Sequence, residues 1–272
     1  MGILRYQNGA GVRYARVEGS EATPLRAATL IEALNDAEPD GPSVARASLT
    51  PLPALDPGGK ILCVALNYVD HAKESAQPIP ETPLLFFKAA ECMIGADDPI
   101  DPPAIVDQLD YEGEIAIVIG KGGRDIAKEN ALDHIAGVAP FNDVSARNLF
   151  KVKAGGTVHL DWFSGKAIDR STPMGPEVVP ISEIRSMLKD RTMRVVTKVN
   201  GEVRQDAAIS DMIFDIPTLV AFVSSRVTLS PGDVIATGTP PGVGAGTGRF
   251  ISSGDVVRVE ITGLPVLESR VA

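Results

Sequence analysis

The sequence is poor in the residues that build thiolate or histidine metal sites. Its two cysteines, Cys63 and Cys92, lie in apolar surroundings without Cys-x-x-Cys or Cys/His spacing, so we expect buried reduced thiols. Its three histidines, His71, His134 and His159, show no His-Glu-x-x-His or similar spacing. A zinc site is therefore not expected.

Positive charge is also in deficit. The chain has 26 Lys+Arg against 35 Asp+Glu, which gives a formal net charge of -9 and a pI near 4.9. An extended phosphate backbone is an unsuitable partner for such a surface, so nucleic acid binding is not expected. No stretch reaches the roughly 18 to 20 apolar residues that span a bilayer, and residues 1–5 lack a signal-segment pattern. We expect a cytoplasmic protein without a membrane partner.

Two common catalytic motifs are missing as well. There is no Gly-x-Ser-x-Gly elbow for a nucleophilic serine. The glycine-rich segment 238–248 fits neither Gly-x-Gly-x-x-Gly nor Gly-x4-Gly-Lys-Ser/Thr, which argues against a nucleotide site. We interpret this segment as a structural loop, or as one that brings Thr239 and backbone amides to a small anion.

What the chain does contain is enough apolar material for a large core. With 272 residues and 44% hydrophobic residues, it can form one sizeable domain or a main domain with a small one. Strand patterns at 3–6 and 12–17 flank the turn signal Asn8-Gly9, and a short helix is predicted over 29–35. Prolines then interrupt the chain up to Pro57. We predict a small N-terminal β-rich domain over residues 1–57 and a main domain over 58–272.

The main domain is predicted to be mixed α/β and mainly β. Strands dominate and no regular βαβ alternation is visible, which favours a closed or rolled sheet. The strongest predicted elements are strands at 61–66, 84–88, 115–119, 138–141, 234–237 and 256–261, a hairpin around Asn200-Gly201, and helices at 128–135 and 215–224.

One strand carries acid at its start. Glu112 and Glu114 precede the apolar run 115–119 and point to the same side of a strand. Their repulsion, roughly 1 to 4 kcal/mol, calls for water, a proton or a cation between them. A solvated strand face is the commoner explanation of a lone Glu-x-Glu. Asp143, which follows the apolar run 138–141, offers a third oxygen ligand, and carboxylates suit Mg2+, Mn2+ or Ca2+.

A histidine and a glutamate form the second pattern. His71 and Glu74 are three residues apart on a predicted short helix, with Asn67 or Asp70 as its cap. On one helix face, the carboxylate can orient the imidazole and raise its basicity. An isolated pair of this kind is more often a surface ion pair.

The order and spacing of six motifs closely resemble the fumarylacetoacetate hydrolase family from about residue 60 to the C-terminus. The motifs are Leu66 to His71, Asp110 to Glu114, Asn142 to Arg147, Gly165-Lys166, the hairpin around Asn200-Gly201, and Gly232 to Gly244. The resemblance implies an FAH-type β-roll main domain that binds Mg2+ or Mn2+, a smaller N-terminal domain, a homodimer, and a small 2-oxo acid substrate.

The resemblance also implies roles for single residues. The metal ligands would be Glu112, Glu114 and Asp143, and the water-activating pair would be His71 and Glu74. The groups that hold the substrate's oxyanion and carboxylate would be Lys166, Arg147 and Thr239, with Tyr68 as a further substrate-binding residue. The sequence departs from the family at Phe150, where relatives often carry Gln, and in the distinctive segment 151–161, to which we assign no role.

The implied activity is hydrolysis of a C–C bond in an acylpyruvate-type 2,4-dioxo acid through a metal-stabilised enolate. The same enolate arises by decarboxylation or isomerisation of a related 2-oxo acid, of the oxaloacetate or 2-hydroxyhepta-2,4-diene-1,7-dioate type. A non-catalytic protein that binds a small acid on the same fold is the further alternative.

Overall fold

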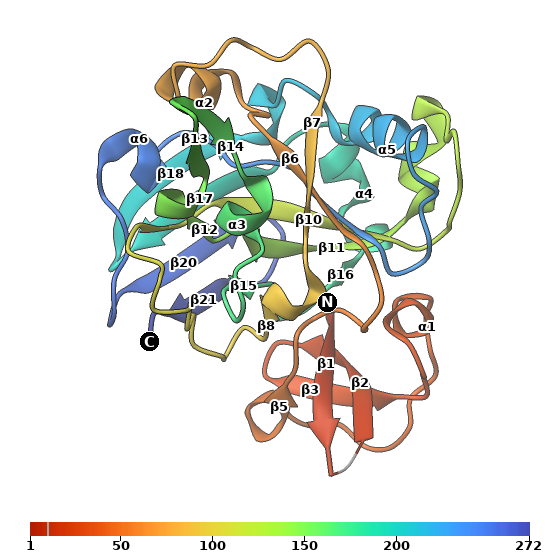
Figure 1. Cartoon of the computed structure of the whole chain (residues 1–272). Coiled ribbons are helices and arrows are strands. Elements are labelled where there is room, and N and C mark those ends of the chain that lie inside the picture. Colours follow the sequence, from red (N-terminus) through yellow and green to blue (C-terminus); the bar gives the residue numbers. More distant parts are fainter. Residues whose placement is uncertain (10) are drawn as a thin grey trace.

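A small sheet forms the N-terminal part of the molecule (Figure 1). The computed structural model describes residues 1–9 and 11–272, and the predicted turn at Asn8-Gly9 runs into Ala10, outside these residues. The five strands lie in the order β4-β3-β2-β1-β5. They are β1 (Gly2–Asn8), β2 (Gly11–Glu18), β3 (Glu21–Leu25), β4 (Val44–Ala45) and β5 (Thr50–Pro51), with helix α1 (Leu30–Leu34) and the 3-10 turn Arg46–Ser48 beside them.

The centre of the molecule is a six-stranded mixed sheet in the order β16-β11-β10-β19-β6-β7. Its strands are β6 (Ile61–Ala65), β7 (Leu84–Lys88), β10 (Gly113–Ile119), β11 (Ile135–Asn142), β16 (Val179–Pro180) and β19 (Val234–Ala236). Strand β10 is antiparallel to both β11 and β19, whereas β19 is parallel to β6. The start of β10 and the C-terminal ends of β6, β11 and β19 therefore lie together, at the same end of the strands of this sheet.

Both faces of this sheet are buried, which explains the continuous apolar run in β10. Ile115, Ile117 and Ile119 pack into one core, whereas Ala116 and Val118 pack into another on the opposite face. The first core is closed by a four-stranded sheet of β17 (Arg194–Val199), β18 (Glu202–Ala208), β20 (Val256–Ile261) and β21 (Leu267–Arg270), with helices α4 (Ile181–Lys189) and α5 (Ile216–Ser224). The mixed, mainly β architecture is as predicted.

Local sequence explains the elements that were best predicted. Asp215 caps α5 by accepting a hydrogen bond from Thr218 N at 2.9 Å, and Pro217 occupies its first turn. Asn200 and Gly201 connect β17 to β18 with positive φ angles of 51° and 81°, as a tight hairpin turn requires.

The helix predicted over 128–135 is wrong in type, because Lys128–His134 forms a 3-10 segment. Asn130 and Asp133 favour turns over an α-helix interior, and Ile135 already belongs to β11. The remaining elements are α2 (Val69–Glu74), β8 (Met93–Ile94), β9 (Leu109–Asp110), β12 (Ser145–Ala146), β13 (Lys151–Ala154), β14 (Thr157–Leu160), α3 (Trp162–Lys166), β15 (Thr172–Pro173), α6 (Gly244–Thr247), and the 3-10 turns Ala90–Cys92, Arg147–Leu149 and Ile209–Asp211.

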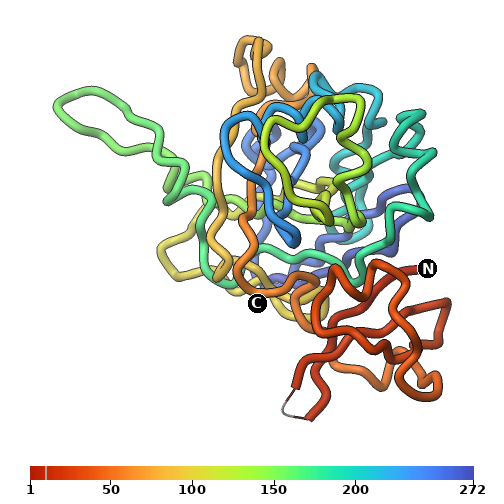
Figure 2. The backbone as a smooth tube through the Cα atoms, turned by 90° about the vertical axis from the view of Figure 1, so that its right-hand side faces the viewer, coloured from red at the N-terminus to blue at the C-terminus, as the bar shows by residue number. Residues whose placement is uncertain are grey.

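Two further features concern the surface. Strands β13 and β14 form a hairpin that extends away from the body as a green arm in Figure 2. Within the described residues, no helix is long and apolar enough to cross a membrane.

Candidate active site

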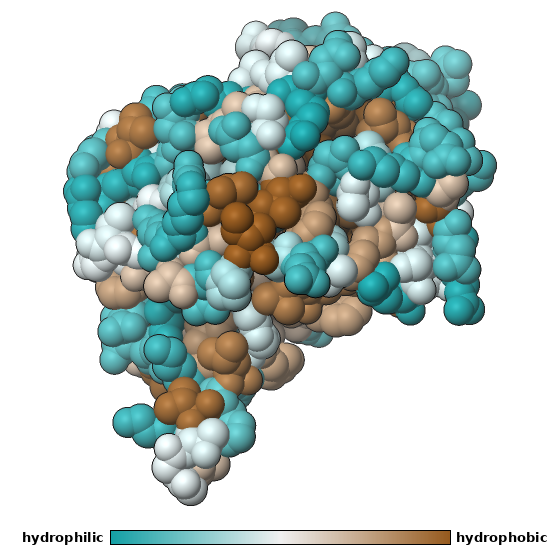
Figure 3. All heavy atoms as spheres, turned by 90° about the horizontal axis from the view of Figure 1, so that it is seen from above, coloured by the Kyte–Doolittle hydropathy of each residue, from teal (hydrophilic) through white to brown (hydrophobic). Residues whose placement is uncertain are grey.

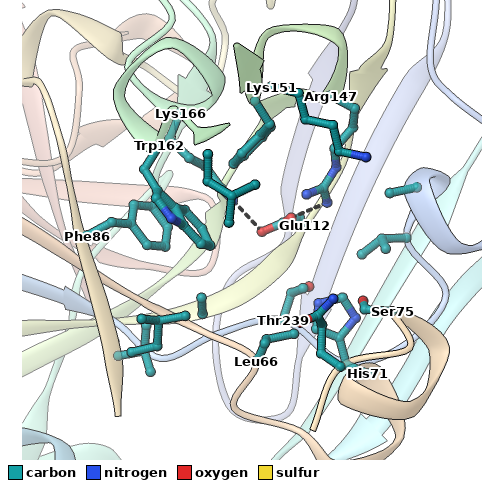
Figure 4. Close-up of a pocket in the computed structure, with 18 of the residues that line it drawn as sticks. Leu66, His71, Ser75, Phe86, Glu112, Arg147, Lys151, Trp162, Lys166 and Thr239 are labelled. Atoms are coloured by element: carbon teal, nitrogen blue, oxygen red, sulfur yellow. Dashed lines mark hydrogen bonds and ion pairs between the residues drawn. The ribbon is translucent and has the colours of Figure 1, made fainter. Parts of the chain in front are cut away.

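The shared end of strands β6, β10, β11 and β19 opens into a cavity of about 470 Å³ (Figure 4). Glu112 reaches it from the start of β10, Leu66 from the end of β6, and Thr239 from the segment after β19. The α2 residue His71 lies across the cavity from Lys166. Seen from above, the molecule shows a cluster of apolar side chains near the middle of the face, with mostly hydrophilic side chains around it (Figure 3).

The three carboxylates predicted as metal ligands converge behind the cavity wall. The register pairs Gly113 with Asn142, so the residues next to this pair, including Glu112 and Asp143, lie side by side. Oxygen atoms of Glu112, Glu114 and Asp143 lie within 4.8 Å of one another, and all three side chains are buried. Three carboxylate oxygens so close together could act as ligands of one hard divalent ion.

Cations surround two of these carboxylates. Lys166 Nζ donates to Glu112 Oε2 at 2.7 Å and to Asp143 Oδ2 at 2.6 Å. Arg147 bonds Glu112 with one nitrogen and donates to Asp110 Oδ2 at 2.7 Å with another. Burial raises the pKa of Glu112, but the charges of Lys166 and Arg147 outweigh it and lower that pKa to about 2.

Glu114 is the carboxylate of this group that no described cationic side chain contacts. Its Oε2 accepts a hydrogen bond from Gly238 N at 2.8 Å. Burial, together with the charges of Asp143 and Glu112, raises the pKa of Glu114 well above its usual value. A divalent ion between the three residues would offset this excess negative charge. The all-oxygen donor set fits a hard cation of the Mg2+, Mn2+ or Ca2+ type.

His71 and Glu74 lie as a pair on α2. The distance from His71 Nδ1 to Glu74 Oε2 is 3.4 Å, and Gly242 N donates to both carboxylate oxygens of Glu74 at 3.0 and 3.1 Å. Burial raises the pKa of Glu74, but hydrogen bonds from His71 and Gly242 outweigh it and lower that pKa below its usual value. Glu74 therefore stays ionised and ties α2 to the glycine-rich loop after β19.

The predicted cap of α2 is wrong. The N-cap residue is Tyr68, and it makes no side-chain capping bond. Asn67 instead links two distant segments, because its amide donates to Thr237 O at 2.7 Å and accepts from Phe214 N at 2.9 Å. Asp70 pairs with Lys73 on the exposed side of the helix.

Two predicted substrate-binding residues are placed unfavourably for that role. Tyr68 does not line the cavity; its ring is buried in the core beneath the four-stranded sheet. Thr239 does line the cavity, but its hydroxyl donates to Gly113 O at 3.0 Å and accepts from Gln205 Nε2 at 2.7 Å. Its hydrogen-bonding capacity is therefore largely used by the protein.

Three residues that support the site were missed in the sequence. Lys88 Nζ lies 2.7 Å from Asp143 Oδ1 and donates to Val144 O at 2.9 Å. Asp110 accepts from Gly244 N and Ala245 N in addition to Arg147. Gln205 accepts from Gly113 N at 2.9 Å and donates to Thr239 and Pro240. The sequence held one signal for these residues: Lys88 is a charged residue at the end of the otherwise apolar strand 84–88.

Replacing Gln205 by Leu is expected to lower the free energy of unfolding by about 2 to 4 kcal/mol. The substitution leaves the buried amide of Gly113 without its acceptor, and removes two further buried hydrogen bonds. Urea unfolding measures the change. Val203→Ala, at an exposed position of the same strand, is the control and should change the stability by no more than about 0.5 kcal/mol. Equal stability of both variants would contradict this account.

Comparison with known proteins identifies similar chains. The oxaloacetate tautomerase YisK of Bacillus subtilis is 42% identical over 224 residues, which cover 80% of this chain and 71% of the relative. The structure of a fumarylacetoacetate hydrolase from psychrophilic Exiguobacterium antarcticum matches with a TM-score of 0.85 at 35% identity, covering 100% of this chain and 99% of that one. A fumarylpyruvate hydrolase from Pseudomonas aeruginosa in complex with Mn2+ and pyruvate matches with a TM-score of 0.68 at 30% identity, covering 78% and 89%.

The family model described as fumarylacetoacetate (FAA) hydrolase C-terminal matches residues 60–272, the part of the chain that contains the central sheet, the three carboxylates and the cavity. The chain therefore belongs to the fumarylacetoacetate hydrolase family.

Proposed function

We propose that the protein is a divalent-metal-dependent enzyme that moves a proton next to the keto group of a small 2-oxo acid, as in keto–enol tautomerisation of oxaloacetate. The observation that carries the proposal is the position of His71 in the same cavity as Glu112, beside the buried carboxylate cluster. The 42% identity to a protein named oxaloacetate tautomerase supports the same reaction class. Mg2+ or Mn2+ is the proposed metal, because an Mn2+ complex is known for one similar structure.

A metal held by Glu112, Glu114 and Asp143 would, when bound, polarise the keto oxygen as a Lewis acid and so acidify the neighbouring C–H bond. The protein supplies the proton acceptor. The imidazole of His71 can accept and carry a proton, and Glu74 orients its ring through Nδ1, which leaves Nε2 for the substrate. Moving one proton from carbon to His71, and returning it to oxygen, converts the keto form into the enol.

In this proposal, Lys166 and Arg147 hold the carboxylates in position and do not themselves transfer the proton. Two of the three ammonium protons of Lys166 are used by Glu112 and Asp143, and Arg147 is held between Asp110 and Glu112. Burial lowers the pKa of both bases, but the negative charges around them outweigh it: Asp143 and Glu112 raise the pKa of Lys166, and Glu112 and Asp110 raise that of Arg147. Both bases therefore stay charged. This arrangement presets the geometry of the metal ligands.

Hydrolysis of an acylpyruvate is the second candidate, because two of the similar structures are named as hydrolases. That reaction needs, in addition to proton transfer, a donor for the oxyanion that forms at the attacked carbonyl. Lys166, the expected donor, has one proton left for this purpose, and the hydroxyl proton of Thr239 is already donated to Gly113 O. Because these hydrogen bonds leave few donors for an oxyanion, they favour tautomerisation over hydrolysis as the reaction of this protein.

Turnover with matched substrates tests the proposal. With Mg2+ or Mn2+ present, we expect the protein to accelerate the loss of the ultraviolet absorbance of enol-oxaloacetate, and to lose this activity after EDTA treatment. Restoring the metal should restore the rate. Oxaloacetate is also tested for release of CO2, and an acylpyruvate for release of pyruvate. Faster acylpyruvate cleavage than tautomerisation would replace the proposal by the hydrolase, and no turnover with any of them would leave a binding protein.

A further inference from the structure

The hairpin of β13 and β14 is the part of the site that the proposed function does not use. All eight residues of its two strands are exposed, and it stands away from the body of the molecule (Figure 2). Its base, however, is fixed. Phe150 O accepts a hydrogen bond from Asp161 N at 2.8 Å, and the Phe150 ring packs edge-on against Trp162 at 5.5 Å. The first residue pair of the hairpin is therefore held at the cavity.

That first pair turns one face of the hairpin toward the cavity. Lys151 lies opposite Leu160 in the antiparallel register, so the two side chains share a face, and both line the cavity. Figure 4 shows the Lys151 side chain projecting into the cavity beside Arg147. Lys153 lies on the same face, about 7 Å further along the strand, and does not line the cavity.

Lys151 differs from the other two basic residues in the cavity wall. Lys166 is paired with Glu112 and Asp143, and Arg147 with Asp110 and Glu112. Lys151 makes no ion pair with any acidic side chain in the described part of the chain. Its ammonium group is therefore available to a negatively charged ligand.

We propose that Lys151 binds the carboxylate at the far end of the substrate from the 2-oxo acid, and so selects dicarboxylates over monocarboxylates. This assignment rests on the proposed function, which places the 2-oxo acid end at the carboxylate cluster. The wall beside Lys151 is apolar, formed by Phe150, Leu160 and Trp162. Within this wall only Trp162 has a polar atom, its indole N–H, so the ammonium group of Lys151 is the charged partner that this part of the cavity offers a carboxylate.

Binding of two matched acids to the holoprotein tests the assignment. With Mg2+ present, isothermal titration compares 2-oxoglutarate with 2-oxopentanoate, which has the same five carbons but lacks the distal carboxylate. We expect wild type to prefer 2-oxoglutarate by about 10- to 100-fold, as for one hydrogen bond to a charged group. Lys151→Met should remove this preference by weakening 2-oxoglutarate alone. Lys151→Arg should retain most of it.

Lys153→Met is the matched control, because it removes the same charge from the same face of the hairpin outside the cavity. It should leave the preference unchanged. The assignment is overturned if Lys151→Met keeps the wild-type preference, if both variants lose it equally, or if wild type binds neither acid or both acids alike. Failure of the proposed function looks different: the preference would depend on Lys151 while oxaloacetate is not turned over.

Discussion

Glu114→Gln is expected to abolish binding of Mg2+ and Mn2+ and to reduce the rate of 2-oxo acid turnover by about a thousandfold or more. The negative charges of Glu112 and Asp143 are already balanced by ion pairs with Lys166, Arg147 and Lys88. Glu114 therefore supplies the unbalanced negative charge that attracts a metal ion. Without the ion, several kcal/mol of stabilisation of the developing negative charge is lost. Isothermal titration with Mn2+ and the tautomerase assay at saturating metal measure the two effects.

The stability of the metal-free variant separates this loss of charge from damage to the fold. Gln keeps the shape of Glu and can accept the hydrogen bond from Gly238 N with its amide oxygen. It also removes a buried charge that Asp143 and Glu112 repel. The metal-free variant should therefore unfold at the same temperature as wild type or higher. Glu268→Gln, at an exposed position of β21, should change neither metal binding nor turnover. Wild-type affinity of Glu114→Gln for Mn2+ would contradict the proposed ligand set.

The sequence predicts the central strand and its acids well, because the signals are local. The apolar run after Glu114 is long enough for a strand buried on both faces, and alternation alone puts Glu112 and Glu114 on one side. The position of Asp143 beside Glu112 could not be predicted in the same way, because it depends on the pairing of Gly113 with Asn142 between two strands. Nothing in either segment encodes this register, so the residues alone offered Asp143 as a possible third oxygen ligand, and the family resemblance then implied that the three carboxylates share one metal.

The supporting residues were missed because their partners are remote in the sequence. Lys88 bonds a carbonyl 56 residues away, Gln205 an amide 92 residues away, and Asp110 an amide 134 residues away. A pattern confined to neighbouring residues carries no information on such contacts. Tyr68 lies within a motif of the family, yet the structure turns its ring into the core and away from the cavity lining. A motif fixes the residue type and leaves the direction of the side chain to the packing.

The β13–β14 hairpin shows a third limit. Its strands do alternate polar and apolar residues on either side of Gly155-Gly156, but each is only four residues long and all eight residues are exposed, so the fold buries neither face of the pattern. Its position at the cavity follows from Phe150, whose ring packs on Trp162 and lies so close to Gly165 that a Cβ there would overlap it. The departure at Phe150 and the distinctive segment after it are thus parts of one structural unit.

His71→Gln is expected to lower the rate of tautomerisation by about 100- to 10,000-fold, the usual contribution of a positioned general base. Gln retains a polar side chain of similar length but cannot accept and carry the proton. Binding of Mn2+ should stay at the wild-type level, because His71 is not among the three carboxylate ligands. The tautomerase assay and Mn2+ titration together distinguish the two kinds of loss. His71→Gln should lose turnover but keep Mn2+ binding, whereas Glu114→Gln should lose both.

Lys73→Gln on the same helix provides the matched control for His71→Gln. Lys73 is exposed and pairs with Asp70 on the solvent side of α2, so its loss removes a surface ion pair worth less than about 1 kcal/mol. Its rate should remain within about twofold of wild type, since such a pair contributes nothing to the cavity. Added imidazole should restore part of the activity of the smaller variant His71→Gly, because a free base then occupies the place of the ring. If His71→Gln tautomerises oxaloacetate as fast as Lys73→Gln, the proton is carried by another group, and the assignment of α2 as the catalytic helix is wrong.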